Sequence, residues 1–230
     1  ASFANQKSID YPLQDLAING EATLKILECL SKQNSVFVYA SSSCVYGNTN
    51  SAMAEDAKPL PETPYGITKL LGEYYTNFFR DYHGLKTSIV RYFNTYGPNE
   101  YPGPYRNVIP KFIDMALNKK KLVITGDGSE TRDFTYVADA INGTILAAEN
   151  ASGKTFNIGS GKETSILQLA ELVNNECNGI GIDFQPKRTW DHISRRVAVI
   201  DGAKEQIAYA PSVNIAEGIK RTVAWFKKNK

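Results

Sequence analysis

Hydrophobic and polar positions follow two alternating patterns along the chain, one typical of buried strands and one of helices. Residues 35–40 and 87–93 form short, unbroken apolar runs rich in β-branched side chains, as in buried parallel strands. Helical spacing of apolar residues extends over 13–30 and 64–82, and Gly84 ends the second helix. Strands that alternate with helices in this way predict an α/β fold built on a parallel sheet.

The pattern becomes more mixed near residue 94. Residues 94–107 form a long loop with three prolines and three tyrosines, which is more typical of a binding lid than of a connector. Beyond this loop we expect strands at 121–125 and 155–158, and helices at 108–117, 137–150, 166–177 and 215–228. We therefore expect a domain boundary near Asn94, with residues 1–93 on one side and 94–230 on the other.

Composition excludes several classes of protein. The 230 residues carry 26 basic and 24 acidic side chains, and a net charge of +2 does not attract a nucleic acid polymer or a membrane surface. The sequence has no apolar run of about 18 residues and no leader pattern. Cys29, Cys44 and Cys177 are odd in number and scattered, which favours a reducing, cytoplasmic location. His83 and His192 lie far from any cysteine, so we expect no metal site.

Tyr65 and Lys69 are the first candidates for chemistry. They lie four residues apart in a predicted helix, so their side chains share one face. An ammonium near a phenol favours the phenolate and should lower the pKa of Tyr65, which would make it an acid and base for an alcohol or sugar hydroxyl. Tyr82 and Lys86 have the same spacing, so the pair by itself is also compatible with a surface contact.

A serine-rich segment upstream strengthens this interpretation. Residues 41–47, Ser-Ser-Ser-Cys-Val-Tyr-Gly, follow a predicted buried strand, and open α/β sheets place their ligands at that end of their strands. A hydroxyl there can bind the reacting oxygen and share its proton with Tyr65. Alone, the segment would be read as a turn that caps a strand.

Four ordered segments resemble one enzyme family. They are YASSSCVYG (39–47), PETPYGITKLLGEYY (61–75), VRYFNTYGP (90–98) and GDGSETRDFTYVADA (126–140). Their order resembles the extended short-chain dehydrogenases/reductases, and within them the NAD-dependent nucleotide-sugar epimerases and dehydratases. The resemblance implies that residues 1–93 are the C-terminal part of a doubly wound, Rossmann-like NAD-binding domain. Residues 94–230 would mainly form a smaller α/β domain that binds the nucleotide sugar.

The resemblance also implies roles for single residues. Tyr65 matches the catalytic base, Lys69 the lysine that holds the NAD ribose, and Ser42 the catalytic hydroxyl. The implied cofactor contacts are Asn19, Ser41, Tyr65, Lys69 and Tyr92. The implied substrate contacts are Asn94, Asn107, Arg132 and Arg196, with Asn107 at a helix N-terminus that suits the diphosphate. Arg195 stands beside Arg196, and Arg196 is our choice for the second diphosphate arginine.

Two positions depart from the family pattern and narrow the choice among its reactions. In the family that this sequence resembles, dehydratases carry an Asp-Glu pair directly after the catalytic hydroxyl. Decarboxylases carry a Glu at the second of these two positions. Ser43 and Cys44 occupy these positions and cannot supply the same acid. We therefore expect 4-epimerisation of a UDP-glucose or UDP-galactose type of substrate. A 4,6-dehydratase, a decarboxylase and a catalytically silent nucleotide-sugar-binding subunit stay open as alternatives, and we expect loop 94–107 and Trp190 to influence selectivity.

A third departure concerns the cofactor. The family begins with a strand, a Gly-rich turn and a helix that hold the pyrophosphate, and this sequence has no G-x-G-x-x-G after a strand. We therefore expect two βαβ units to be missing. The sequence would then be part of a longer enzyme, or a chain that cannot hold NAD in the usual way and is inactive alone.

We also expect self-association. A parallel sheet without its first strands exposes a hydrophobic edge, which a second copy or the missing part should cover. The resemblance implies a homodimer built on two helices from each subunit, here near residues 15–30 and 66–82. The apolar faces of these helices could instead pack on their own sheet.

Overall fold

Two layers of helices enclose a small parallel sheet in a computed structural model that describes residues 5–105, 107–187 and 193–229. The sheet has the order β1–β2–β7, with β1 at Val36–Ser42, β2 at Lys86–Tyr92 and β7 at Thr155–Ile158. Both pairings are parallel, and Ser42 lies opposite Tyr92 at their C-terminal ends. The predicted α/β fold with a parallel sheet is therefore confirmed.

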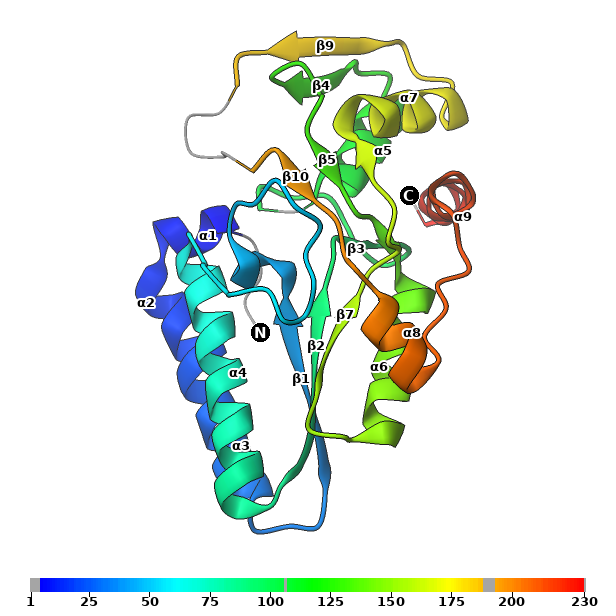
Figure 1. Cartoon of the computed structure of the whole chain (residues 1–230). Coiled ribbons are helices and arrows are strands. Elements are labelled where there is room, and N and C mark those ends of the chain that lie inside the picture. The colour runs from blue at the N-terminus through cyan, green and yellow to red at the C-terminus, as the bar shows by residue number, and fades with distance from the viewer. Residues whose placement is uncertain (1–4, 106, 188–192, 230) are drawn as a thin grey trace.

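Helices from the first third of the chain cover one side of this sheet (Figure 1). They are α1 (Asn5–Asp10), α2 (Pro12–Asp15), α3 (Ala22–Leu30) and α4 (Pro64–His83), with a π-helical segment at Leu16–Glu21 between α2 and α3. The N-cap Thr63 accepts a hydrogen bond from the Gly66 N–H, and Gly84 ends α4 in the left-handed conformation. Leu27, Phe79 and Leu85 form the small core between α3, α4 and the sheet.

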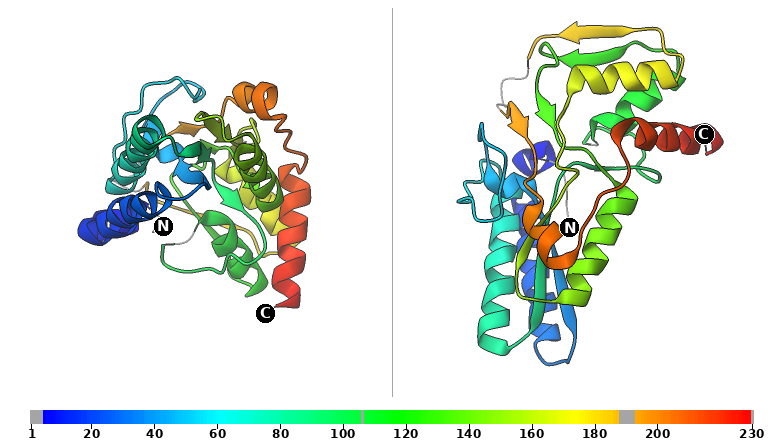
Figure 2. Two further views of the ribbon diagram at one scale, coloured as in Figure 1. Left: turned by 90° about the horizontal axis from the view of Figure 1, so that it is seen from below. Right: turned by 45° about the vertical axis from the view of Figure 1, so that its right-hand side comes forward.

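The other side of the sheet is covered by helices from the second half of the chain, α6 (Val137–Asn150) and α8 (Asp201–Ile207) (Figure 2). Together with β7, these elements return residues beyond 94 to the first sheet. The boundary near Asn94 stays a proposal, and the later segment contributes to both halves of the molecule. Within the described part of the chain, β1 pairs with β2 alone.

A second core lies beyond the C-terminal ends of the strands. It is built by α5 (Val108–Leu117), α7 (Ile166–Glu176) and α9 (Ile215–Lys228) against β4 (Leu122–Thr125) and β9 (Ile182–Gln185). Four of the predicted elements, at 108–117, 137–150, 155–158 and 215–228, have the observed bounds. Short two-residue strands complete this half, and the sequence pattern did not predict them: β3 (Thr95–Tyr96), β5 (Thr131–Arg132), β6 (Thr135–Tyr136), β8 (Thr164–Ser165) and β10 (Arg195–Arg196).

Candidate active site

Two neighbouring cavities lie where the sheet meets the second core. The larger, of about 410 Å³, contains Ser42, Cys44 and Tyr65 at one end and Asn107 in its wall. The smaller, of about 250 Å³, contains Arg132 and the inner face of β4. Both are lined by Asn94, Thr95 and Asn107, so they are parts of one site. A site that combines hydroxyls with two arginines, Arg132 and Arg196, suits a polar, anionic ligand.

Helix α4 brings Tyr65 and Lys69 to the end of β1. The Lys69 Nζ lies 5.8 Å from the centre of the Tyr65 ring and donates a 2.8 Å hydrogen bond to the Ala40 carbonyl. The Ser42 hydroxyl lines the same cavity as Tyr65 and lies close enough to its phenol to lower the Tyr65 pKa. The Tyr65 N–H donates to the hydroxyl of the buried Ser8, which holds the first turn of the helix. The structure thus brings the three predicted catalytic residues together.

The charge states of this pair differ from the sequence-based expectation. Burial raises the pKa of Tyr65, and the neighbouring Cys44 raises it further, against smaller opposing effects of the Ser42 hydrogen bond and the Arg196 charge. Burial also lowers the pKa of Lys69 to about 8. The expected lowering of the Tyr65 pKa by Lys69 is therefore wrong for this structure, because loss of hydration is the largest effect on the phenol.

Ser42 stands at the start of a short 3-10 turn, Ser43–Tyr46. Its hydroxyl accepts a hydrogen bond from the Cys44 N–H at 3.2 Å, which fixes the side chain at the point where the strand ends. Cys44 faces the larger cavity, and Arg196 donates to its Sγ at 3.4 Å. The two positions that follow Ser42 thus place a hydroxyl and a thiol in the cavity wall, and the carboxylate that lines this cavity comes from Glu100.

Asn19 lies behind this site in the π-helical segment. Its side-chain amide donates to Asp15 at 3.0 Å, and Asp15 also accepts a 2.5 Å hydrogen bond from Thr68 of α4. All three side chains are buried. Single π-helical turns in α-helices are frequent at functional sites, and here the turn directs Asn19 toward the helix that carries Tyr65. A cofactor contact of Asn19 stays a prediction.

The remaining cofactor candidates have partners within the chain. The Ser41 hydroxyl donates to Glu73 at 2.5 Å and is buried, so it faces α4. The Tyr92 hydroxyl lies 2.6 Å from Thr144 of α6, while Tyr92 also lines the larger cavity. Their cofactor contacts likewise stay predictions.

The two arginines predicted for the diphosphate are neighbours. Arg132 on β5 and Arg196 on β10 lie opposite each other in a parallel pairing. Because side chains alternate along a strand, both project from the same face, and Arg195 projects from the other. Arg195 forms an exposed ion pair with Glu163, whereas Arg196 is buried and lines the larger cavity. The geometry therefore favours Arg196 over Arg195 as a ligand-facing residue.

Asn94 and Asn107 lie where the two cavities meet. Asn94 has a positive φ of 23° and donates to the Asp133 carbonyl. Asn107 is the N-cap residue of α5, but its side chain donates to Glu100 and caps no helical N–H. The first turn of α5 has no acidic residue, so its N-terminus is compatible with an anion.

Sequence reasoning missed the buried carboxylates around this site. Asp15 lies beside Tyr65 and Lys69, and Glu73 contacts the serine before Ser42. Glu73 could have been found, because it is eight residues after Tyr65 and so falls on the same helix face. Nothing in the local pattern identifies Asp15, because its role depends on the π-helical turn that follows it.

The described residues fit a ribose of NAD but not its pyrophosphate. The buried Lys69 ammonium carries three N–H donors, and Ala40 accepts one of them, which leaves two for ribose hydroxyls. The pyrophosphate end has no such support: within the described residues, no strand of the β1–β2–β7 sheet leads through a Gly-rich turn directly into a helix.

Metal-binding clusters and membrane-spanning helices are absent from the described part of the chain. No three His, Cys, Asp or Glu side chains gather there in a way that could hold a metal ion. None of the helices described is long and apolar enough to span a membrane. His192 and Trp190 lie outside the described residues.

Known proteins resemble the chain in sequence and in structure. Residues 1–159 match the NAD dependent epimerase/dehydratase family. The chain is 35% identical, over 97% of its length and 74% of the relative's, to a putative UDP-glucose 4-epimerase of Methanocaldococcus jannaschii. It is 34% identical, over 97% of its length and 72% of the relative's, to a UDP-N-acetyl-alpha-D-glucosaminuronate decarboxylase of Bacillus cytotoxicus.

An epimerase structure from Methanothermobacter thermautotrophicus superposes with a TM-score of 0.96 at 42% identity, covering all of this chain and 70% of that one. The matches extend through both halves of the molecule and include the segments that build the two cavities. The chain belongs to the NAD dependent epimerase/dehydratase family, whose members are enzymes that act on nucleotide sugars.

Proposed function

We propose that this protein epimerises a nucleotide sugar of the UDP-glucose/UDP-galactose type at C4 through a 4-keto intermediate. The observation that carries the proposal is the end of the larger cavity. Tyr65 and Ser42 line this cavity together, the Ser42 hydroxyl favours the Tyr65 phenolate, and neither of the next two residues, Ser43 and Cys44, is a carboxylate. Elimination or decarboxylation needs a further acid or base, whereas epimerisation at C4 needs one proton carrier and a hydride acceptor.

Each site residue has its own role in the proposed reaction. Ser42 binds the C4 oxygen and Tyr65 takes the hydroxyl proton, then returns it when the sugar is reduced on its other face. NAD, when bound, accepts the C4 hydride and gives it back. Lys69 would hold its ribose, and the Ser42 hydroxyl and the Arg196 charge favour the phenolate of Tyr65. Arg132, Arg196 and the N-terminus of α5 hold the diphosphate, with Asn94 and Asn107 beside it.

The first experiment follows conversion of UDP-galactose to UDP-glucose by the natural protein supplied with NAD. We expect interconversion, and a loss of roughly 10²–10⁴-fold in kcat for Tyr65→Phe, because the proton carrier is removed. Tyr82→Phe is the matched control: it lies on the same helix, precedes Lys86 with the same spacing and is exposed, so kcat should not change.

Other products would contradict this reaction. A 4-keto-6-deoxy sugar would indicate a dehydratase, and CO₂ from a uronate would indicate a decarboxylase. Binding of UDP without turnover, and without binding of NAD, would indicate a silent subunit.

We also propose a cytoplasmic homodimer. The helices near 15–30 and 66–82 carry exposed apolar side chains that a second copy would cover: Leu16, Ile18, Ile26, Ile67, Tyr74 and Phe78. A reducing compartment is supported by the cysteines, which are all free, with Cys29 exposed.

A further inference from the structure

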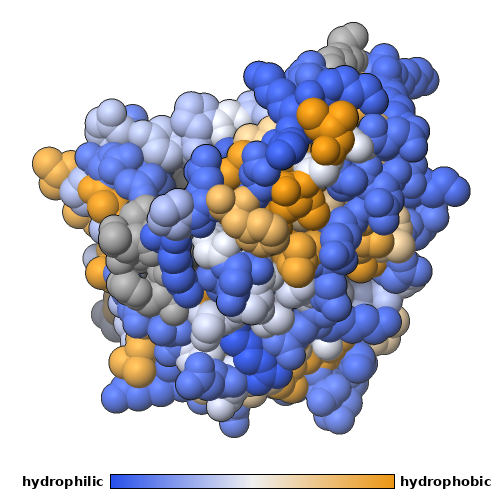
Figure 3. Space-filling view, turned by 90° about the horizontal axis from the view of Figure 1, so that it is seen from above, coloured by the Kyte–Doolittle hydropathy of each residue, from blue (hydrophilic) through white to orange (hydrophobic). Residues whose placement is uncertain are grey.

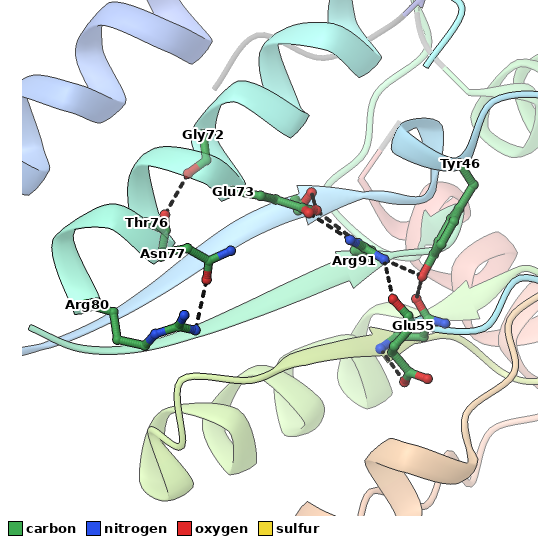
Figure 4. A network of polar contacts seen from close by, with 10 residues as sticks. Tyr46, Glu55, Gly72, Glu73, Thr76, Asn77, Arg80 and Arg91 are labelled. Atoms are coloured by element: carbon green, nitrogen blue, oxygen red, sulfur yellow. Dashed lines mark hydrogen bonds and ion pairs between the residues drawn. The ribbon is translucent and has the colours of Figure 1, made fainter. Parts of the chain in front are cut away.

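A buried ion pair lies directly behind the candidate active site. Glu73 of α4 and Arg91 of β2 form two hydrogen bonds, Nε to Oε1 at 2.9 Å and Nη2 to Oε2 at 2.8 Å (Figure 4). Their side chains are 4% and 6% exposed. A charge pair this deeply buried costs hydration, and apolar residues of similar volume are often at least as stabilising. Stability alone is therefore a weak reason for its presence.

Both partners of this pair make further hydrogen bonds. Arg91 also donates from Nη1 to the Tyr46 hydroxyl at 2.8 Å and to the Glu55 carbonyl at 3.0 Å, and Tyr46 donates to Asn157. Glu73 accepts the hydroxyl of Ser41 at 2.5 Å. The network thus ties α4 to the ends of β1, β2 and β7 and to the turn that follows β1.

Three residues on one face of α4 meet three successive residues of β1. Tyr65, Lys69 and Glu73 are spaced by four, so they are aligned along the helix. Lys69 donates to the Ala40 carbonyl, Glu73 accepts from the Ser41 hydroxyl, and Tyr65 lies beside Ser42 in the wall of the larger cavity. Of these three residues, Glu73 also contacts the central strand, because it is paired with Arg91 of β2.

We propose that Glu73 is a positioning residue of the active site, which holds Ser41 while paired with Arg91 and so fixes the Tyr65 helix against Ser42. The inference rests on the proposed use of Tyr65 and Ser42 as the proton-carrying pair. Ser41 and Ser42 are adjacent, so a shift of one moves the other, and a displacement of about 1 Å at a reacting group can cost up to about 100-fold in rate.

The clearest test removes the Ser41 hydroxyl. Ser41→Ala removes the hydrogen bond between Glu73 and β1 but leaves Glu73 paired with Arg91, so no buried charge loses its partner. Ser41→Thr restores a hydroxyl. Thr76→Val is the matched control, since it also removes a buried hydroxyl from the α4 region, but Thr76 donates only to Gly72 of its own helix (Figure 4). Glu73→Gln serves as a second variant if it folds.

The first readout needs neither NAD nor turnover. Cys44 lies in the turn that Ser42 caps, while Cys29 is exposed and lies outside that turn, on α3. We expect Ser41→Ala to loosen the turn and to raise the rate of Cys44 alkylation by iodoacetamide about threefold or more relative to Cys29, measured by mass spectrometry. Thr76→Val and Ser41→Thr should keep the wild-type ratio.

The second readout is kinetic, in the natural protein with NAD and UDP-galactose. Ser41→Ala should lower kcat by about tenfold and change the KM for UDP-galactose less than about twofold, because the predicted contacts to the nucleotide sugar are untouched and the reacting groups are misaligned. A wild-type alkylation ratio in Ser41→Ala would overturn the positioning role. If wild-type protein shows no epimerisation, the proposed function is wrong. The alkylation ratio still decides whether Glu73 holds Ser41 in position.

Discussion

Lys69 shows how one residue can carry a functional charge at a cost in stability. Its ammonium is buried, and burial lowers its pKa from 10.5 to about 8. The unfolded chain therefore binds more protons than the native protein between these two pH values, so the free energy of unfolding should rise with pH across that window. Well below pH 8 the buried charge is present in nearly every molecule and destabilises the native state.

Substitution of Lys69 tests whether the free energy of unfolding rises with pH in this window. We expect the wild-type free energy of unfolding in urea to gain about 2 kcal/mol from Lys69 between about pH 7 and pH 9.5, and Lys69→Met to lose that gain. Lys86→Met, at an exposed position of β2, should keep it. The comparison must stay below about pH 10, because buried tyrosines with raised pKa values then begin to favour unfolding. Equal pH slopes in the two variants would contradict the prediction.

Helix α4 can lie close to β1 because one of its residues has no side chain. Gly72 lies between Lys69 and Glu73, and a Cβ built there would overlap the hydroxyl and ring of Tyr39. Tyr39 is buried, and its ring lies 5.3 Å from the Lys69 Nζ. The glycine thus sets the distance between the helix that carries Tyr65 and the strand that leads to Ser42.

We expect Gly72→Ala to lower the free energy of unfolding by about 1–3 kcal/mol, because the overlap outweighs the better helix propensity of alanine. Urea unfolding gives the measurement. Gly202→Ala in α8 is the control, since its nearest neighbour, a Glu55 carboxylate oxygen, lies at an ordinary 3.4 Å, so stability should stay the same or rise. If Gly72→Ala were as stable as Gly202→Ala, the close approach would not limit the packing of α4.

For the whole molecule, the distribution of exposed apolar side chains is uneven. The face seen from above is mostly hydrophilic, with hydrophobic side chains in small groups (Figure 3). Helix α4 and the segment before α3, by contrast, expose several large apolar side chains, with Leu13 81% exposed and Phe78 49%. A two-fold arrangement would bury these helices against their copies.

Charged substitutions on these helices should therefore break the proposed dimer. We expect Phe78→Glu to shift the mass found by light scattering from that of a dimer to that of a monomer, because a buried unpaired carboxylate is costly at an interface. Phe184→Glu changes an equally exposed ring on β9 and should leave the dimer intact. A wild-type monomer, or a Phe78→Glu dimer, would contradict the proposed interface.

Local pattern was sufficient for much of the fold and for part of the site. Apolar spacing determined the bounds of α5, α6 and α9, since each buries one face on a core. The spacing of Tyr65 and Lys69 placed them on one face of α4, and four ordered segments were enough to recognise the family. These features depend on short stretches of chain, which is why the sequence by itself determined them.

Tertiary structure decided what depends on residues far apart. The register of β10 against β5 turns Arg196 toward the cavity and Arg195 away, which two adjacent arginines cannot reveal. Glu73 meets Arg91 and Ser41 only after α4 packs on the sheet, and burial then raises the pKa of Tyr65. Hydration and pairing depend on the neighbours that folding supplies, and a local pattern does not contain them.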